Sequence, residues 1–343
     1  MRRYGSGGSG TYRTVQRIIW YVVVLLLAAG VSLDAAAQGQ PQASGYPDRP
    51  IRLIVPVSVG GSTDIVARII ANKLSVELHQ QLVIDNRTGA GGIIGTETVA
   101  KATPDGYTLL FAYAAHTITP FLSGKVPYDP ALDFAAVSLV TTQPLVLTVN
   151  ASLPVSSVKE LIALAKAKPG EIRAAAPGMG GTGHIAAEIL KLETGADIPT
   201  IIYKGGGPAQ LALLQGEVHF IFATTAAAMP QIKSGRVKVL ATSSAQRLPY
   251  LPEVPTFAEA GLPGVSVNPW QGILAPARTP RAIIDKLQRT VVSILKQPDT
   301  VERLAATGSD PVSSTPEELA AKIKKELEYF GRIIKAANIR IEW

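Results

Sequence analysis

Short apolar runs alternate along this chain with longer stretches in which apolar residues recur at helical spacing. The runs that predict strands are Ile51–Val57, Thr108–Ala112, Leu145–Val149, Thr200–Tyr203, Val218–Phe222 and Val237–Ala241. Runs of this length separated by amphipathic stretches are typical of α/β proteins. We therefore predict an α/β fold.

Two helices have clear predicted starts. Ser157 with Glu160, and Thr315 with Glu318, fit the capping box, in which a hydroxyl and a carboxylate satisfy amides at the first turn. The helix after Thr315 is predicted to bury one face, formed by Leu319, Ile323, Leu327, Phe330 and Ile334.

The strand–turn–helix pattern occurs twice. Residues 51–78 and 172–192 both read as a strand, a glycine-rich turn, a hydroxyl residue and a helix, with Gly60-Gly61-Ser62 matching Gly180-Gly181-Thr182. Residues 147–166 and 274–294 give a second, weaker match. Because both matches occur in the same order, we predict two half-chains of like topology that face each other across a cleft.

The repeated turns suggest anion binding. A helix N-terminus offers unpaired amides and a partial positive charge, and glycine lets the backbone approach a ligand closely. Ser62, Thr63 and Thr182 could add hydroxyl donors, and Asp64 reads as a partner of the helix dipole. The alternative is that Ser62 or Thr182 only caps its own helix.

The N-terminus reads as an export signal. Residues 1–17 hold four arginines and no acid, an apolar run spans 18–29, and Ala35-Ala36-Ala37 ends the segment. This pattern predicts a secretory signal peptide at residues 1–37, cleaved after Ala37. A retained membrane anchor is the alternative, although about 20 apolar residues are needed to span a bilayer.

Composition narrows the function classes. The 343 residues include no cysteine, which excludes disulfides, thiolate nucleophiles and cysteine-ligated metals. Residues 38–343 hold 29 basic and 25 acidic residues, too balanced for phosphate-tracking nucleic-acid binding. The four histidines have no metal-ligand spacing, and no catalytic triad is visible.

A dinucleotide enzyme is the main alternative. Gly178–Gly183 matches G-x-G-x-x-G between a predicted strand and a predicted helix. The motif also needs an acid about 20 residues later, but the next strand ends at Tyr203 with Lys204 and three glycines. We therefore expect no cofactor and no metal.

Several segments together resemble the Bug family, the periplasmic solute receptors of tripartite tricarboxylate transporters. The segments are residues 46–52 (YPDRPIR), 60–64 (GGSTD), 85–92 (DNRTGAGG), 104–109 (PDGYTL), 203–205 (YKG), 251–256 (LPEVPT) and 259–261 (EAG). They extend the resemblance from Tyr46 to about Ile341.

The resemblance implies two Rossmann-like lobes in the type II periplasmic-binding (Venus flytrap) fold. Lobe 1 would take residues 46–145 plus 266–343, and lobe 2 residues 146–265. It also implies a monomeric, non-enzymatic periplasmic receptor that passes a small organic carboxylate to membrane permease subunits. A receptor that signals without transport is a further alternative.

In such receptors the turns matching Val57–Thr63 and Ala176–Thr182 hold the ligand, largely through backbone groups. The expected ligand-binding residues in this chain are Ser58, Gly60, Gly61, Ser62, Thr63, Tyr113, His116, Ala176, Gly178, Gly181, Thr182, Lys204 and Thr224.

The chain departs from the family pattern at several of these positions. Val57-Ser58-Val59 stands where an aromatic residue and prolines are common, and Met179 where Asn is common. Ala223 and Thr224 stand where many members carry an acid that could pair with a ligand ammonium group. We therefore expect a carboxylate without an adjacent amine, with a more apolar body.

Overall fold

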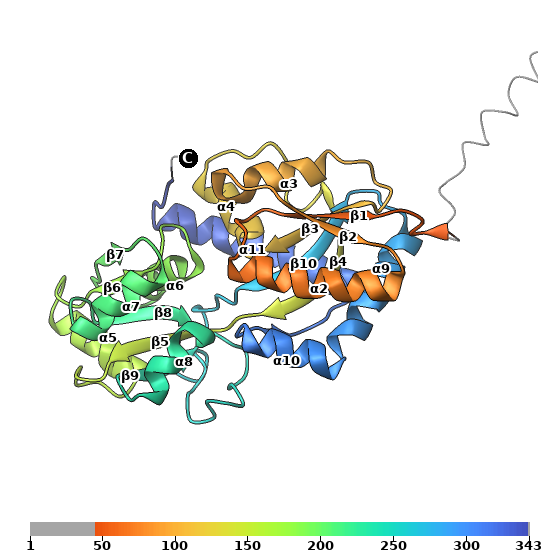
Figure 1. The fold of residues 1–343 in the computed structure, drawn as a ribbon. Coiled ribbons are helices and arrows are strands. Elements are labelled where there is room, and N and C mark those ends of the chain that lie inside the picture. The colour runs from red at the N-terminus through yellow and green to blue at the C-terminus, as the bar shows by residue number, and fades with distance from the viewer. Residues whose placement is uncertain (1–44, 342–343) are drawn as a thin grey trace, which may run out of the picture. The chain divides into compact units, whose positions relative to one another are not determined.

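Two mixed β-sheets with flanking helices form the fold in a computed structural model, which describes residues 45–341 (Figure 1). The signal-peptide segment predicted at residues 1–37 lies outside the described residues. The first sheet contains β1 (Ile51–Val55), β2 (Leu82–Asn86), β3 (Thr108–Tyr113), β4 (Phe134–Thr142), β10 (Trp270–Pro276) and β11 (Asp310–Pro311). The second contains β5 (Leu145–Asn150), β6 (Ala174–Ala176), β7 (Thr200–Ile202), β8 (Phe220–Thr224) and β9 (Val237–Thr242).

The two sheets have the same topology. The first has the order β11-β4-β10-β3-β1-β2 and the second β9-β5-β8-β6-β7. In each, the first strand of the repeat (β1 or β6) pairs in parallel with the next two. A strand from the other half of the chain, β10 or β5, then inserts antiparallel. Both repeats predicted from the sequence are therefore confirmed as equivalent structural units.

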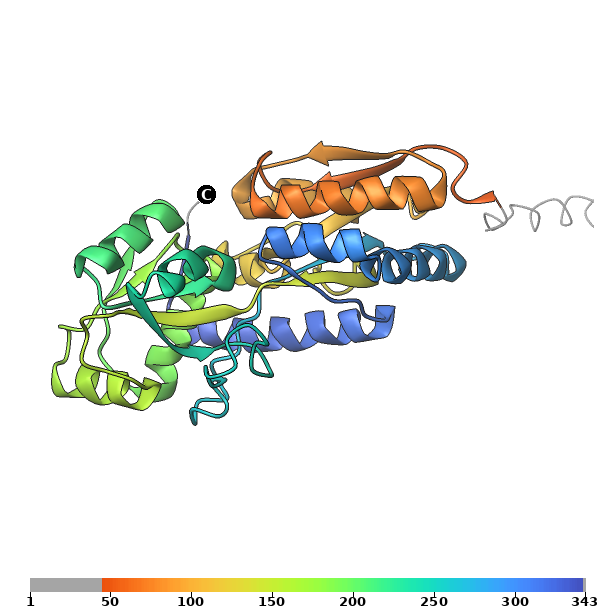
Figure 2. The same cartoon turned by 60° about the horizontal axis from the view of Figure 1, so that its bottom comes forward.

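Helices flank both sheets. The helices of the first sheet are α2 (Ser62–Leu78), the 3-10 helix η3 (Ala90–Gly92), α3 (Ile93–Ala100), α4 (Ala115–Leu122), α9 (Arg281–Leu295), α10 (Pro298–Ala306) and α11 (Pro316–Ala336). Those of the second are α5 (Val158–Ala167), α6 (Thr182–Thr194), α7 (Gly206–Gln215) and α8 (Thr225–Lys233). Helices α9 and α11 both pack against β4 (Figure 2). We call each sheet with its helices a lobe.

Most of the predicted elements are confirmed. Thr315 and Glu318 form the complete capping box, and the predicted apolar face of α11 is buried or packed on the core. The box at Ser157 is only half formed, because the Glu160 carboxylate accepts from the amide of Ser156 instead. The prediction missed β2 and β4, and it placed β8 two residues too early.

The chain crosses between the sheets twice, and the crossings lie side by side. The amide of Gln143, between β4 and β5, donates to the carbonyl of Pro269, between β9 and β10, at 2.8 Å. The amide of Leu145, at the start of β5, also donates to the hydroxyl of Ser243, at the start of the second connection, at 2.9 Å. These bonds join the two connections into one strip.

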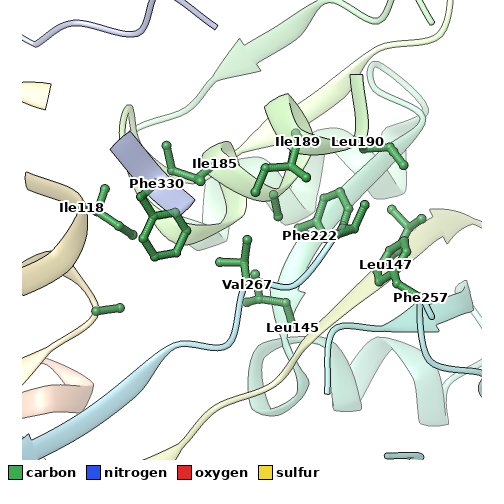
Figure 3. Packing of buried hydrophobic residues seen from close by; sticks show 14 of the residues in the cluster. Ile118, Leu145, Leu147, Ile185, Ile189, Leu190, Phe222, Phe257, Val267 and Phe330 are labelled. Atoms are coloured by element: carbon green, nitrogen blue, oxygen red, sulfur yellow. The ribbon is translucent and has the colours of Figure 1, made fainter. Parts of the chain in front are cut away.

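Apolar side chains continue from one lobe into the other. Figure 3 shows Ile118 of α4 and Phe330 of α11 next to Ile185 of α6, within one buried cluster. Leu145 and Phe222 extend the same cluster into the second sheet. Because the cluster is continuous, the lobes share part of their core.

Candidate functional site

The two repeated glycine turns have the same backbone geometry. Gly60 and Gly180 both have a positive φ, of 85° and 71°. Gly61 and Gly181 follow with φ/ψ of −72°/161° and −67°/162°. In both turns the second glycine donates to the carbonyl three residues before it, Ser58 or Gly178, at 3.4 Å. The turns differ by a constant 120 residues, so each residue of one has a counterpart in the other.

Both helices begin without a side-chain cap. Gly61 and Gly181 are the N-cap residues of α2 and α6 and have no side chain to offer. The alternative that Ser62 or Thr182 caps its own helix is therefore wrong, because each is the first helical residue.

These helix starts leave several amides available. Within residues 45–341, the amides of Ser62, Thr63, Thr182 and Gly183 have no hydrogen-bond acceptor. Each turn thus presents at least two free donors at the positive end of a helix dipole, which is the arrangement that binds anions.

The first turn is fixed by a buried carboxylate. Asp64 is 1% exposed, and its Oδ2 accepts from the Gly60 amide at 2.9 Å and from Arg68 Nε at 2.9 Å. Its Oδ1 accepts from Asn86 at 2.8 Å. Burial opposes ionisation, but the bonds from Arg68, Gly60 and Asn86 outweigh it and hold the pKa of Asp64 below its usual value. Asp64 therefore shapes the turn, and the Gly60 amide is not available to a ligand.

The second turn is fixed at the same position by a histidine. His184 is the counterpart of Asp64, and its Nδ1 accepts from the Gly180 amide at 2.9 Å. The sequence match aligns His184 with Asp64, but only the structure shows that both side chains accept the amide of the same glycine position.

Exposed apolar side chains lie at the tips of both turns. Val59 is 70% exposed and its counterpart Met179 is 51% exposed. Ser58 and Ser62 are also exposed, whereas Thr63 is buried and accepts from Gln271 Nε2 at 3.2 Å. The tips therefore present an apolar side chain beside the free amides.

The structure places Tyr113 and His116 on the edge of the first-lobe core. The Tyr113 hydroxyl donates to the Gly91 carbonyl at 3.4 Å, and burial raises its pKa to about 12, so it stays protonated. His116 is 4% exposed, stacks on Tyr128 and meets Phe134 edge-on. Burial lowers the pKa of His116 to about 4, although its Nε2–H donates to the Pro130 carbonyl at 2.8 Å. These surroundings favour a packing role for His116 over the expected direct contact with ligand.

The remaining expected residues lie at the ends of second-sheet strands. Ala176 is buried at the end of β6 and accepts through its carbonyl from Tyr203. Thr224 ends β8 and caps α8, accepting from the Ala227 amide at 3.4 Å. Lys204 is exposed and forms no ion pair with any residue in the described range. It is thus a free cation at the same edge of the sheet.

The strand-end turns of the second lobe face the first lobe. A side chain at Gly180 would meet Leu122 of α4 and Ile341, and one at Gly308 would meet Ala226 at the start of α8. Tyr250 donates to Thr225. Beside that second contact lies a cavity of about 370 Å³, lined by Thr225, Ala226, Met229, Tyr250, Ala305, Ala306, Gly308 and Asp310.

No cluster of three or more histidine or acidic side chains is arranged to hold a metal ion within residues 45–341. Over the same range, no helix is long and apolar enough to cross a membrane.

Comparison with known proteins decides the family. A sequence profile described as "Tripartite tricarboxylate transporter family receptor" matches residues 66–339. The chain belongs to the tripartite tricarboxylate transporter receptor family. The resemblance to Bug receptors is thereby confirmed.

This chain is also similar to individual proteins and solved structures. Protein BugT of Bordetella pertussis is 38% identical over 321 residues, which cover 93% of this chain and 98% of BugT. The structure of R. palustris Rpa4515 with adipate is 35% identical, has a TM-score of 0.71, and the match covers 86% of this chain and 99% of that one. MatC from Rhodopseudomonas palustris with bound malate is 32% identical, has a TM-score of 0.68, and the match covers 84% and 100%.

Membership settles two expectations. The fold is the two-lobed α/β type II periplasmic-binding fold. Family members are solute-binding receptors rather than enzymes, so the dinucleotide-dependent oxidoreductase at Gly178–Gly183 is not retained.

Proposed function

We propose that this protein is a periplasmic receptor that binds a small organic carboxylate between its two lobes and delivers it to the permease subunits of a tripartite transporter. The lobes comprise residues 46–145 plus 266–343 and residues 146–265, and the receptor acts as a monomer. The signal peptide at residues 1–37 directs it to the periplasm.

The pair of matching helix starts carries this proposal. Free amides at Ser62 and Thr63 in one lobe, and at Thr182 and Gly183 in the other, provide donors for carboxylate oxygens without a buried cation. Relatives with adipate and with malate support a carboxylate ligand.

The tips of the turns narrow the ligand class. Val59 and Met179 give the site apolar surface, and Ala223 offers no charge to a ligand ammonium group. The ligand is therefore a carboxylate without an adjacent amine. Glutamate or aspartate binding more tightly than adipate and malate in calorimetry would refute this part.

Proline substitutions at the first helical positions test the amide donors. Ser62→Pro and Thr182→Pro each delete one free amide, while proline fits this position of a helix and the extended backbone of Gly61 and Gly181. Loss of a hydrogen bond to a charged group costs about 1.5–3 kcal/mol, so calorimetry should show binding of adipate or malate weakened about 10- to 100-fold.

Ser62→Ala is the matched control, because it removes the hydroxyl and keeps the amide. It should weaken binding much less than Ser62→Pro. Equal affinity for the proline variants and the wild type, with melting temperatures unchanged, would place the ligand elsewhere.

Measuring carboxylate uptake distinguishes a receptor that serves transport from one that only signals. If the receptor delivers its ligand, deletion of its gene abolishes uptake of that carboxylate in the native cell. Normal uptake in the deletion strain, with ligand binding intact in vitro, would instead favour a signalling receptor.

A further inference from the structure

The equivalent side chains Asp64 and His184 differ in one chemical respect. Both accept the amide of the positive-φ glycine four residues earlier, at 2.9 Å in each turn. Each also lies next to a side chain of opposite charge type one helical turn later. Asp64 pairs with Arg68, and His184 lies near Glu188. Asp64 is a permanent acceptor, whereas an imidazole nitrogen accepts only when it is unprotonated.

We propose that His184 is a positioning residue that holds the second turn in its anion-binding shape when neutral and releases it when protonated. This inference rests on the proposed function, since it concerns how the same turn presents its amides to a carboxylate.

The hydrogen bond fixes the tautomer. Because the Gly180 amide is a donor, Nδ1 of His184 carries no proton and Nε2 carries it. Nε2 lies 3.7 Å from Glu188 Oε1. Protonation therefore has to occur at Nδ1, where a second donor would oppose the Gly180 amide.

The charged groups around His184 are few. Glu188 and Lys191 belong to its own helix, and Glu188 also accepts from Lys191 at 2.9 Å and from Thr200 of β7 at 2.8 Å. The strands packed against α6, namely β6, β7 and β8, contain no charged residue. Helix α11 meets α6 through the apolar Phe330 beside Ile185 (Figure 3).

The charge of a protonated His184 therefore does not make up, in ligand binding, for the lost hydrogen bond from the Gly180 amide. An imidazolium at position 184 would attract an anion, but the adjacent Glu188 carboxylate offsets its charge. Burial holds the pKa of His184 below its usual value; the Glu188 carboxylate raises this pKa in part, and Lys191 lowers it further. The ring is thus neutral near pH 7 and is protonated only under acidic conditions.

The hydrogen bond to His184 affects ligand binding through the position of Gly180. It precedes the N-cap Gly181, so its orientation sets the direction of the Thr182 and Gly183 amides. It also contacts Leu122 and Ile341 of the first lobe. A turn that loses the bond between Gly180 and His184 therefore loses the orientation of these amides and its packing against the first lobe.

Two substitutions distinguish the roles of the two ring nitrogens of His184. In His184→Asn, the side-chain oxygen takes the place of Nδ1 and accepts the Gly180 amide at any pH. In His184→Gln, the side-chain nitrogen takes the place of Nε2 and the acceptor near Gly180 is lost. Calorimetry with adipate and with malate at about pH 7.5 and about pH 5 compares them with the wild type.

We expect His184→Asn to bind as the wild type does at about pH 7.5, and His184→Gln to bind about tenfold more weakly. Between about pH 7.5 and about pH 5, the wild type should lose more affinity than His184→Asn, whose own loss reports the pH response of the ligand.

A readout without ligand keeps this test separate from the proposed function. Amide hydrogen exchange should show Gly180 protected in the wild type and in His184→Asn, and at least about tenfold less protected in His184→Gln. If neither carboxylate binds the wild type but this pattern is seen, the proposed ligand fails while the role of His184 in the turn is supported.

Two results would overturn the inference. One is equal protection of Gly180 in His184→Gln and the wild type. The other is normal, pH-independent affinity in His184→Gln despite loss of that protection.

Discussion

His116 is a buried titratable residue whose surroundings control how stability depends on pH. Its ring is enclosed by Tyr128 and Phe134, and only Nε2 has a partner. Within residues 45–341, Nδ1 has no hydrogen-bond partner. A neutral histidine in such a place resists protonation until the protein unfolds.

The sign of the effect follows from the two pKa values. The pKa of His116 is about 4 in the folded protein and 6.5 in the reference state, so the unfolded chain binds the proton more readily. The contribution of His116 to the free energy of unfolding is fully present above about pH 6.5. It falls by about 3 kcal/mol as the pH drops toward 4.

His116→Gln tests this assignment, because its amide nitrogen can still donate to Pro130 but does not titrate. The variant should be less stable at pH 7, since the ring packing is lost, yet show a flatter loss of stability between about pH 6.5 and pH 4 in urea unfolding. His79→Asn, at an exposed left-handed position, is the control and should keep the wild-type slope. A slope in His116→Gln as steep as that of the wild type would contradict the assignment.

At the scale of elements, helix α6 depends on its close approach to β8. A side chain at Gly183 would lie 2.6 Å from the Phe222 carbonyl oxygen. The helix therefore starts at a distance from the sheet that only glycine permits, and this distance places the Thr182 and Gly183 amides.

Gly183→Ala should push the start of α6 away from β8. We expect a loss of about 1–3 kcal/mol in the free energy of unfolding and a weaker affinity for carboxylate, measured by urea unfolding and calorimetry. Gly207→Ala in the first turn of α7 is the matched control, since a side chain there would meet no atom within 4 Å, and it should be neutral or slightly stabilising. A Gly183→Ala protein with unaltered stability would argue against this close packing.

The elements that could be predicted from the sequence are those with local signals. The capping box at Thr315, the strand β1 and the two glycine turns all follow from neighbouring residues. Strand β4 was missed because Phe134–Thr142 mixes small and polar residues, and its burial depends on β10, α9 and α11, which are distant in sequence.

The candidate site also has features that could be predicted from local sequence and features that could not. The turns and the helix starts that follow them could be predicted, because glycines before a hydroxyl residue are a local pattern. The bonds from Gly60 to Asp64 and from Gly180 to His184 could not, because an aspartate and a histidine have no common sequence signal.

At the scale of the whole molecule, the side-by-side crossings at Gln143 and Pro269 suggest a hinge. Ligand held by one lobe would recruit the other by rotation about this strip, and the closed form would be the one the permease recognises. The contact between Ala226 and Gly308 lies at the junction of the lobes and would limit that rotation.

Ala226→Trp should act as a wedge at this contact. If the closed form falls to about a tenth of its normal population, the apparent affinity falls about tenfold, while the fold is retained. Calorimetry and small-angle scattering with and without adipate would measure the two effects. Ala227→Trp places the same bulk on the next, exposed residue and should bind normally; equal affinities in the two variants would exclude closure at this junction.

If the free main-chain amides of Ser62, Thr63, Thr182 and Gly183 hold the ligand, as proposed, this has a consequence for how such receptors diversify. An amide survives every substitution except proline, so mutation rarely erases the acid-holding part of the site. The tips at Val59 and Met179 can then change in size and polarity at little risk to it. A gene duplicate could acquire a new nutrient through a few changes at these tips, on an inherited scaffold that already retains acids.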